Sequence, residues 1–336
     1  MREMTFWRAL NDGIRSAMAD DPRVFIMGED LTRWAAGGGT FGVTRGLLSE
    51  FGSERVFDTP ISEEALVAAA VGAALRGCRP IVEIMYADFS LLAFDPIINQ
   101  AAKIRYMFGG QFEVPLVVRS NGGAGTGKAA QHSQSLETLF AHVPGLEVVV
   151  PATPHDARNL FRSAVASPNP TIFLEHKALY NVRGPVDETP VPLGVARTAR
   201  PGHDVTIVAT QLMVHRSLAA AERLMAKDDI DCEIIDLRTL YPLDLDTVVA
   251  SARRTRHVLI CHEAPLLYGF GGEIAATISE TCWKELEAPV RRLGGARTPI
   301  AYAAELEAEV LPSEERIETA VCELMRRPNA FPADPS

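Results

Sequence analysis

Three carboxylates stand within seven residues of one another in the segment DTPISEEAL, which begins at Asp58. A carboxyl group in an apolar crevice can exchange a proton with a ligand near neutral pH, so Glu63 and Glu64 are candidates for acid–base chemistry. A helix start is the alternative: Pro60 disfavours helix before it, Ser62 can cap the following amides, and acids suit the positive end of a helix dipole. The local pattern favours the helix start, and the rest of the chain must decide whether either glutamate is also a reagent.

A second candidate is His132, which lies in the glycine-rich segment NGGAGTGKAAQHSQS, residues 121–135. The segment follows the apolar run PLVVRS, and ligands of α/β proteins bind just beyond the carboxyl ends of parallel strands. A lone histidine is more often structural than catalytic, but Gln131, Ser133 and Gln134 give His132 polar neighbours that indicate a loop rather than a core. Both interpretations of His132 stay open at this point.

Three other motifs lack the sequence context that a binding site of their kind requires. GGGTFG, residues 37–42, fits the dinucleotide pattern G-x-G-x-x-G, but no expected strand runs directly into it, as that site requires. The glycine–lysine pair at Lys128 lacks the Ser or Thr that follows it in a phosphate-binding P-loop. Cys261, His262 and Glu263 are adjacent on an expected strand, where side chains alternate between faces, so they cannot all address one ligand.

Short apolar runs rich in β-branched residues alternate with segments of helical periodicity along the whole chain. Expected strands begin near residues 24, 80, 115, 146 and 171, and again near 205, 232, 258 and 289. Expected helices cover 63–76, 95–107, 154–166, 214–226, 246–253 and 272–286. Strands that are apolar throughout are buried on both faces, so the pattern predicts an α/β fold of two domains, each a mostly parallel sheet flanked by helices. The predicted boundaries are a first domain at 1–183, a proline- and glycine-rich linker at 184–204, and a second domain at 205–336.

Composition narrows the class of partner. The 336 residues are 47% hydrophobic and 23% charged, with a net charge of -10, which leaves no dominant basic surface for nucleic acid or an anionic membrane. Small molecules and proteins remain as partners. Five widely spaced cysteines are expected to be buried free thiols in a reducing compartment, and no apolar run is long enough to cross a bilayer. The N-terminal segment lacks the continuous apolar core of a signal peptide, so we expect a cytoplasmic protein.

Eight segments together resemble one enzyme family. They are MGEDL, FGVTRGLLSEFGSERVFDTPISE, GAALRGCRPIVEIMYADF, NQAAKIRYMFGG, AAQHSQS, HVPGLEVVVPATPHDA, EHKALY and DLRTLYPLD. The chain resembles the β subunit of thiamine-diphosphate-dependent 2-oxoacid dehydrogenases, colinearly from Thr5 to Ile317, and RYMFGG, EHKALY and MVHRSLAAAE look most like acetoin and pyruvate dehydrogenase β subunits. The resemblance implies a transketolase-like pyrimidine-binding domain followed by a transketolase C-terminal domain.

The resemblance also implies roles for single residues. Glu63 corresponds to the glutamate that bonds the 1′ nitrogen of the cofactor's aminopyrimidine and favours its imino tautomer, and Glu64 would remain an acid of the first helical turn. Phe89 matches the aromatic residue that stacks on the aminopyrimidine, although simple core packing is its alternative. His132 matches the active-site histidine that orients the substrate-derived adduct and the incoming lipoyl group. Glu29 matches a member of an acidic, water-lined path between paired active sites.

Partners and ions follow from the same resemblance. The family's other subunit carries the Gly-Asp-Gly motif that holds magnesium and the diphosphate, and no Gly-Asp-Gly occurs here. The implied assembly is therefore an α2β2 heterotetramer with active sites shared between α and β chains, and its C-terminal domains are expected to contact a lipoyl acyltransferase core. A structural potassium ion in some relatives is held at positions that correspond to Leu116, Ala164, Ser167 and Asn169.

Three departures from the family pattern leave alternatives open. Ala65 and Ala68 replace common glycines and could tighten the cofactor pocket, and Leu92 replaces the Glu or Gln of some pyruvate-type relatives. The leading prediction is a 2-oxoacid or acetoin dehydrogenase β subunit that cleaves a carbon–carbon bond beside a carbonyl in a small 2-oxo or acyloin substrate and passes the acyl group to a lipoyl domain. A carboligase that works without a lipoyl partner is the second enzyme hypothesis. A regulatory or assembly subunit, with Glu63 and His132 vestigial, is the non-enzyme one.

Overall fold

The computed structural model describes residues 1–33 and 38–326, which form two compact units that interleave along the chain. Unit 1 comprises Met1–Gly122, Leu139–Leu193 and Thr239–Pro242. Unit 2 comprises Gly123–Thr138, Gly194–Arg238 and the described residues from Leu243 onward. Gly37, which begins the GGGTFG motif, and residues 327–336, which end the predicted second domain, lie outside the described residues.

Unit 1 is built on a seven-stranded sheet with the strand order β12-β6-β7-β5-β4-β2-β3. Every neighbouring pair in this sheet is parallel except β12 with β6. The strands of the sheet are β2 (Val24–Gly28), β3 (Val56–Asp58), β4 (Arg79–Ile84), β5 (Val117–Gly122), β6 (Glu147–Val149), β7 (Thr171–His176) and β12 (Thr239–Tyr241). A separate antiparallel pair joins β1 (Arg2–Thr5) to β8 (Arg183–Val186).

Helices connect these strands, as parallel pairing demands. They are α1 (Phe6–Asp20), α2 (Leu47–Phe51), α3 (Glu63–Leu75), α4 (Ala102–Met107), α5 (Glu137–Ala141) and α6 (Pro154–Ala166). Shorter turns of helix are η1 (Ala87–Ala93), the π-helical η2 (Pro96–Ala101) and η3 (Lys177–Leu179). Helix α1 packs along α6, while α3 packs on β4 and η1.

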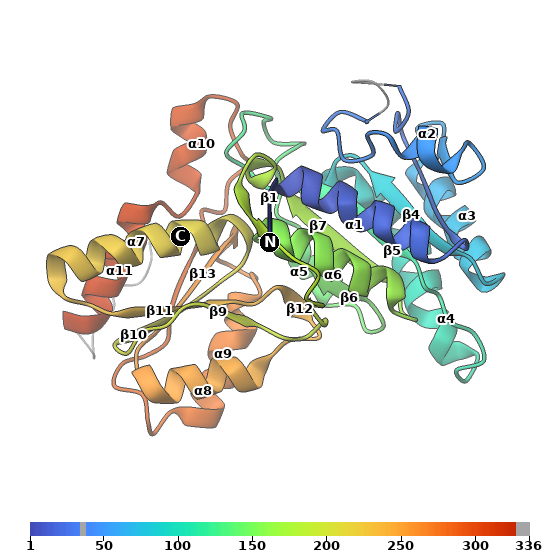
Figure 1. Cartoon of the computed structure of the whole chain (residues 1–336). Coiled ribbons are helices and arrows are strands. Elements are labelled where there is room, and N and C mark those ends of the chain that lie inside the picture. The colour runs from blue at the N-terminus through green and yellow to red at the C-terminus, as the bar shows by residue number, and fades with distance from the viewer. Residues whose placement is uncertain (34–37, 327–336) are drawn as a thin grey trace. The chain divides into compact units, whose positions relative to one another are not determined.

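Unit 2 repeats the same architecture around a five-stranded sheet with the order β14-β13-β10-β11-β9, in which only β9 is antiparallel. Its strands are β9 (Arg197–Arg200), β10 (Val205–Ala209), β11 (Cys232–Asp236), β13 (Val258–Pro265) and β14 (Arg291–Gly295). Its helices are α7 (Gln211–Asp228), α8 (Leu245–Thr255), α9 (Gly271–Cys282), α10 (Ala304–Val310) and α11 (Glu314–Arg326). Helices α7 and α11 cover one face of this sheet and α8 and α9 the other (Figure 1).

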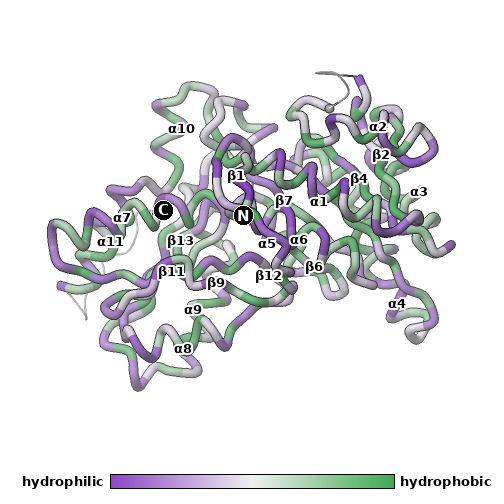
Figure 2. Tube along the Cα trace, in the orientation of Figure 1, coloured by the Kyte–Doolittle hydropathy of each residue, from purple (hydrophilic) through white to green (hydrophobic). Residues whose placement is uncertain are grey.

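The predicted fold class is confirmed, and its cause is visible in the hydropathy of the strands. All five residues of β10 and β11 are buried, as are all six of β5 and β7, and Figure 2 shows apolar segments gathered along the central strands. Strands covered by helices on both faces are mostly apolar on both faces, as in VTIVA of β10. The exceptions are buried polar residues such as Arg119 on β5 and Glu175 on β7. Among the described residues, no helix is both long enough and apolar enough to cross a membrane.

The limits of the two predicted domains remain predictions. Within the predicted linker, β8 extends to Val186 and pairs with β1 in unit 1, whereas Arg197–Arg200 forms β9 on the edge of the unit 2 sheet. Residues 239–242 return to unit 1 as β12, and 123–138 belong to unit 2. Short edge strands carry too little apolar pattern to be predicted from the sequence.

Two local expectations need correction. Ser62 stands at the N-cap position of α3, but its side chain makes no capping hydrogen bond. The five cysteines are all free as predicted, yet only three of them are buried, because Cys78 and Cys322 are partly exposed. Unlike Ser62, Thr153 does cap its helix, because its hydroxyl oxygen accepts the Asp156 amide N–H at the start of α6.

Candidate functional site

Glu63 is the first residue of α3, and its side chain is buried with 6% of its surface exposed. The buried residues of this helix recur with helical spacing at Leu66, Val67 and Ala70, so Glu63 belongs to the face that packs on the sheet. Glu64 is exposed. The structure therefore separates the two neighbouring glutamates, because a step of one residue turns a helical side chain by about 100°. Glu63 is the one directed into the protein.

Glu29 lies at the same edge of the sheet as Glu63. It follows Gly28, the last residue of β2, and Gly28 pairs with Asp58 at the end of β3, which leads into α3. Glu29 is 8% exposed, and its Oε1 atom has no hydrogen-bond partner. Burial, then repulsion from Glu63, Asp30 and Glu83, raises the pKa of Glu29 to about 7. A buried carboxyl with an unpaired oxygen at this edge can exchange a proton near neutral pH.

We expect Glu29→Gln to change how stability depends on pH. A carboxyl whose pKa is raised by folding stabilises the protein while it is protonated, and this contribution is lost as pH rises from its ordinary value of 4.5 through about 7. The melting temperature of Glu29→Gln should therefore match that of the wild type near pH 5 and exceed it near pH 8. Thermal unfolding at both pH values measures this, with the exposed Glu64→Gln as the control. An equal offset at both pH values would contradict the raised pKa.

A buried ion network lies beneath the two glutamates. Arg119 on β5 donates to both carboxylate oxygens of Glu175 on β7, each at 2.7 Å, and a third N–H of Arg119 bonds Glu83 on β4. The Tyr180 hydroxyl donates to Glu175 at 2.6 Å. Burial works against the charge of Arg119, but Glu175 and Glu83 outweigh it and raise the pKa of the guanidinium, while burial raises the pKa of Glu83. The network places one guanidinium between two carboxylates, and Glu83 is its member that acts on Glu29.

Phe89 lies in η1, half-buried, just beyond the carboxyl end of β4. Its backbone N–H donates to the Tyr86 carbonyl at 2.9 Å, which closes the turn that carries the ring. The Tyr86 ring contacts Phe41 edge-on at 5.9 Å and lies 5.5 Å from the Lys177 ammonium. Unit 1 thus brings Glu29, Glu63 and Phe89 to one edge of its sheet. Their roles on the cofactor stay predictions.

His132 belongs to unit 2, in the loop that follows β5. The residue is half-buried, and its backbone N–H donates to the Ala129 carbonyl at 3.3 Å. The segment is a loop, as its glycines and polar residues predict. Its catalytic role remains a prediction.

The adjacent residues of β13 have three different environments. Cys261 is fully buried and its thiol pKa is raised to about 12 by burial. His262 is also buried, with a pKa lowered to about 4 mainly by burial, and its Nδ1 lies 3.0 Å from the Ala264 carbonyl. Glu263 instead accepts hydrogen bonds from the loop that carries His132. Across residues 1–33 and 38–326, no cluster of three or more His, Cys, Asp or Glu side chains could hold a metal ion.

The four predicted potassium positions gather where α6 ends and β7 begins. The Leu116 carbonyl accepts the Thr171 N–H at 2.8 Å, and the Ala164 carbonyl accepts the Ser167 N–H at 3.2 Å. The Asn169 N–H donates to the Ser167 hydroxyl at 3.2 Å. The Asn169 side-chain oxygen already accepts a hydrogen bond from Arg105 Nη1 at 2.7 Å.

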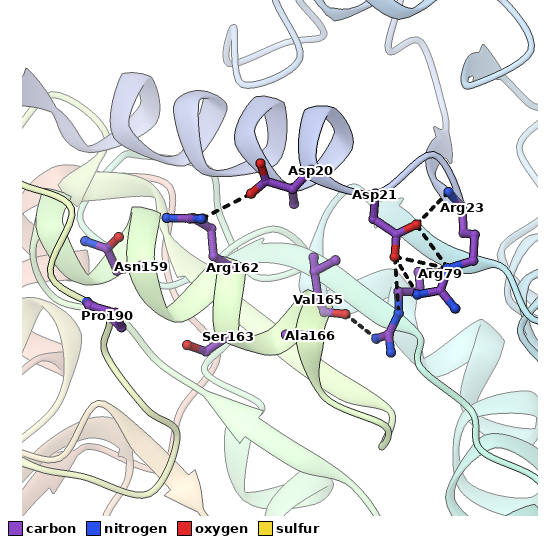
Figure 3. A pocket seen from close by; sticks show the side chains of 11 residues that line it. Asp20, Asp21, Arg23, Arg79, Asn159, Arg162, Ser163, Val165, Ala166 and Pro190 are labelled. Atoms are coloured by element: carbon purple, nitrogen blue, oxygen red, sulfur yellow. Dashed lines mark hydrogen bonds and ion pairs between the residues drawn. The ribbon is translucent and has the colours of Figure 1, made fainter.

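A guanidinium already lies against one of these carbonyls, that of Ser167. Arg79 Nη1 donates to the carbonyls of Val165 at 2.6 Å and Ser167 at 3.1 Å, and Figure 3 shows Arg79 between Asp21 and Val165. The pocket in this view has a volume of about 400 Å³ and is lined by charged side chains that pair with one another, among them Asp20 with Arg162. A potassium ion at Ser167 would share that carbonyl oxygen with a fixed positive charge, so the residues fit a potassium site only in part.

Two domain families match the chain. Residues 2–183 match the transketolase pyrimidine-binding domain and residues 194–317 match the transketolase C-terminal domain. A chain described as an inactive β4 tetramer of split-gene transketolase has the same fold, with a TM-score of 0.77 over 96% of this chain and 98% of that one, at 22% sequence identity.

Curated relatives are similar over nearly their whole length. The acetoin:2,6-dichlorophenolindophenol oxidoreductase β subunit of Cupriavidus necator is 44% identical over 97% of this chain and 98% of its own. The 2-oxoisovalerate dehydrogenase β subunit of Bacillus subtilis is 42% identical over 96% of this chain and 99% of its own. The pyruvate dehydrogenase E1 β subunit of Rickettsia felis is 42% identical over 95% of this chain and 97% of its own. The chain belongs to the transketolase-like β subunits of thiamine-diphosphate-dependent 2-oxoacid and acetoin dehydrogenases.

Proposed function

We propose that this chain supplies half of a thiamine-diphosphate site and works as the β subunit of a 2-oxoacid or acetoin dehydrogenase with an α partner. One observation carries the proposal: two buried glutamates, Glu29 and Glu63, converge at the carboxyl edge of the unit 1 sheet, and Glu29 keeps an oxygen without a hydrogen-bond partner. Buried carboxylate oxygens normally have a hydrogen-bond partner, so one that lacks a partner indicates that a ligand or another chain binds there. The relatives named above support the reaction class.

The residues fit the aminopyrimidine end of the cofactor. Glu63 would hold a proton at the 1′ nitrogen, and Phe89 would present its ring to the aromatic face. Glu29, charged only in part near neutral pH, would accept or return a proton in the same acidic environment. When bound, thiamine diphosphate would supply a carbon nucleophile for the substrate carbonyl and an acceptor for the electron pair of the broken carbon–carbon bond.

The opposite end of the cofactor would be held elsewhere. The sequence has no Gly-Asp-Gly, and no metal-binding cluster of His, Cys, Asp or Glu occurs in the described residues, so magnesium and the diphosphate would be bound by the α chain. His132, in the loop at 123–138, would orient the acyl fragment and the lipoyl group.

Exposed apolar residues beside Glu63 support an α partner. Ile61 is 79% exposed, Leu92 is 61% exposed, and Ala65 and Ala68 lie on the open face of α3. Exposed apolar residues that gather in one patch are typical of a protein interface. We infer an α2β2 heterotetramer, docked through its C-terminal domains on a lipoyl acyltransferase core, in the cytoplasm. Potassium remains a prediction, and the Arg79 contact with the Ser167 carbonyl counts against it.

Co-expression with the α subunit, followed by assays on pyruvate, acetoin and branched 2-oxoacids, tests this function. Each substrate would be offered with a lipoyl domain and, separately, with 2,6-dichlorophenolindophenol as an artificial electron acceptor. We expect one of these substrates to reduce the dye and to acylate the lipoyl domain, and the β chain alone to do neither. Acyloin formation without acylation of a lipoyl domain would instead indicate a carboligase.

A further inference from the structure

The loop that carries His132 is closed on itself at its base. The Gly123 N–H donates to the Gln134 carbonyl at 3.2 Å, so the two ends of this loop meet. Gly123, Gly125 and Gly127 have positive φ angles, as does Ala129 at +61°, a conformation that side-chain-bearing residues rarely adopt. A glycine-rich loop with this backbone is costly to hold in one conformation, because glycine loses the most freedom on ordering. External contacts must fix it.

Glu263 joins both ends of the loop. Its Oε1 atom accepts the Ala124 amide N–H at 2.8 Å and the Ser135 hydroxyl at 2.9 Å. Glu263 lies near the end of β13, an interior strand of the unit 2 sheet, so the anchor is attached to a rigid element. One carboxylate oxygen thus fixes the residues that enter and leave the loop.

Glu307 holds the glycines between those ends. From α10, its Oε1 accepts the Gly125 N–H at 2.8 Å and its Oε2 accepts the Gly127 N–H at 3.1 Å. Glu307 is only 4% exposed, and the same helix places Val310 beside buried Ala124 and Leu311. Hydrogen bonds to an ionised acceptor are about twice as strong as those between neutral groups.

We propose that Glu263 and Glu307 are positioning residues that hold the loop of His132 in its working conformation. The inference rests on the proposed role of His132. The six residues from Gly127 to His132 include no glycine beyond Gly127 itself, so fixing the Gly127 amide limits where His132 can lie. Neither glutamate needs to touch the substrate for this effect.

Glu307→Gln tests the proposal within the assembled α/β enzyme. The glutamine keeps the shape of the side chain but turns one acceptor into a donor that faces an amide N–H. We expect hydrogen exchange across residues 124–131 to rise about tenfold or more and kcat/KM for the lipoyl domain to fall about 10- to 100-fold. Glu309→Gln, on the exposed side of the same helix, is the matched control and should change neither.

A double variant distinguishes an effect of Glu307 on the position of His132 from an unrelated loss of activity. If Glu307 acts through His132, adding Glu307→Gln to His132→Ala should change kcat/KM by less than about twofold. Full additivity of the two losses, or unchanged exchange across 124–131 in Glu307→Gln, would overturn the proposal. Normal activity of His132→Ala would refute the proposed role of His132 itself, while hydrogen exchange would still report whether Glu307 anchors the loop. The thermal melting temperature and α/β assembly of each variant check that it folds.

Discussion

Glu63→Gln is expected to lower the turnover of the α/β enzyme by about a thousandfold or more, the upper part of the range for loss of a proton-transferring group. The amide fills the same volume at the start of α3 but cannot exchange a proton with the 1′ nitrogen. Assembly with the α subunit should persist. Reduction of 2,6-dichlorophenolindophenol measures the turnover without any need for the lipoyl protein, and gel filtration measures the assembly.

Glu64→Gln is the matched control for this variant. It removes the same charge one residue further on, but from the exposed face of the helix, so turnover should stay within about twofold of the wild type. If Glu63→Gln retained a tenth of wild-type turnover while it remained assembled with the α subunit, Glu63 would not be the proton-exchanging group. Equal losses in both variants would point to the helix start rather than to a reagent.

Arg119→Met is expected to cost about 3–5 kcal/mol of stability, because removal of one partner leaves buried charge unpaired. Glu83 and Glu175 would then face each other across a strand with no cation between them. Urea denaturation of the chain measures the loss. Arg162→Met is the control: Arg162 pairs with Asp20 at 3.1 Å on the surface, and loss of such a pair costs about 0–1 kcal/mol.

A triple variant sharpens this prediction. Replacing Glu83 and Glu175 by glutamine together with Arg119→Met removes all three charges and should recover part of the lost stability. If the triple variant were less stable than Arg119→Met alone, packing rather than unpaired charge would explain the loss. The negative charge of this network also acts on Glu29, so its removal should lower the pKa of Glu29.

The α/β fold could be predicted because its strands are buried on both faces. Runs such as VFIMG and TIFLEH became β2 and β7, and the helix expected at 154–166 has those limits in the structure. Edge strands could not be predicted in the same way. The sequence TLY at 239–241 joins unit 1 as β12 only because the chain returns to β6, which is a tertiary effect and has no local signal.

Of the candidate site, the sequence could predict single residues but not the contacts between them. Helical periodicity explains why Glu63 is buried and Glu64 is not, and it needs no structure beyond α3 itself. The two partners of Arg119 lie on two other strands, β4 and β7, far apart in sequence, so charged residues inside apolar runs were the only sign of them in the sequence. The contacts of Glu263 and Glu307 with the glycine-rich loop likewise depend on tertiary folding.

The structure changes the interpretation of two departures from the family pattern, Ala65 and Ala68. Ala65 and Ala68 are exposed on α3, on the face that does not carry Glu63, so their methyl groups do not narrow the crevice around that carboxylate. An open helical face of alanines, with Gly72 also in open space, favours close approach by another chain. We propose that these substitutions adjust the fit of the α partner.

The central claim is that Glu63 governs proton exchange at the cofactor. The most direct measurement is the rate at which the acidic thiazolium carbon of bound thiamine diphosphate exchanges its proton for deuterium, followed by NMR after rapid quenching. With the α subunit and magnesium present and no substrate added, we predict exchange in the wild type that is at least about a hundredfold faster than in Glu63→Gln. Equal exchange rates in the two proteins, at equal cofactor occupancy, would contradict the account.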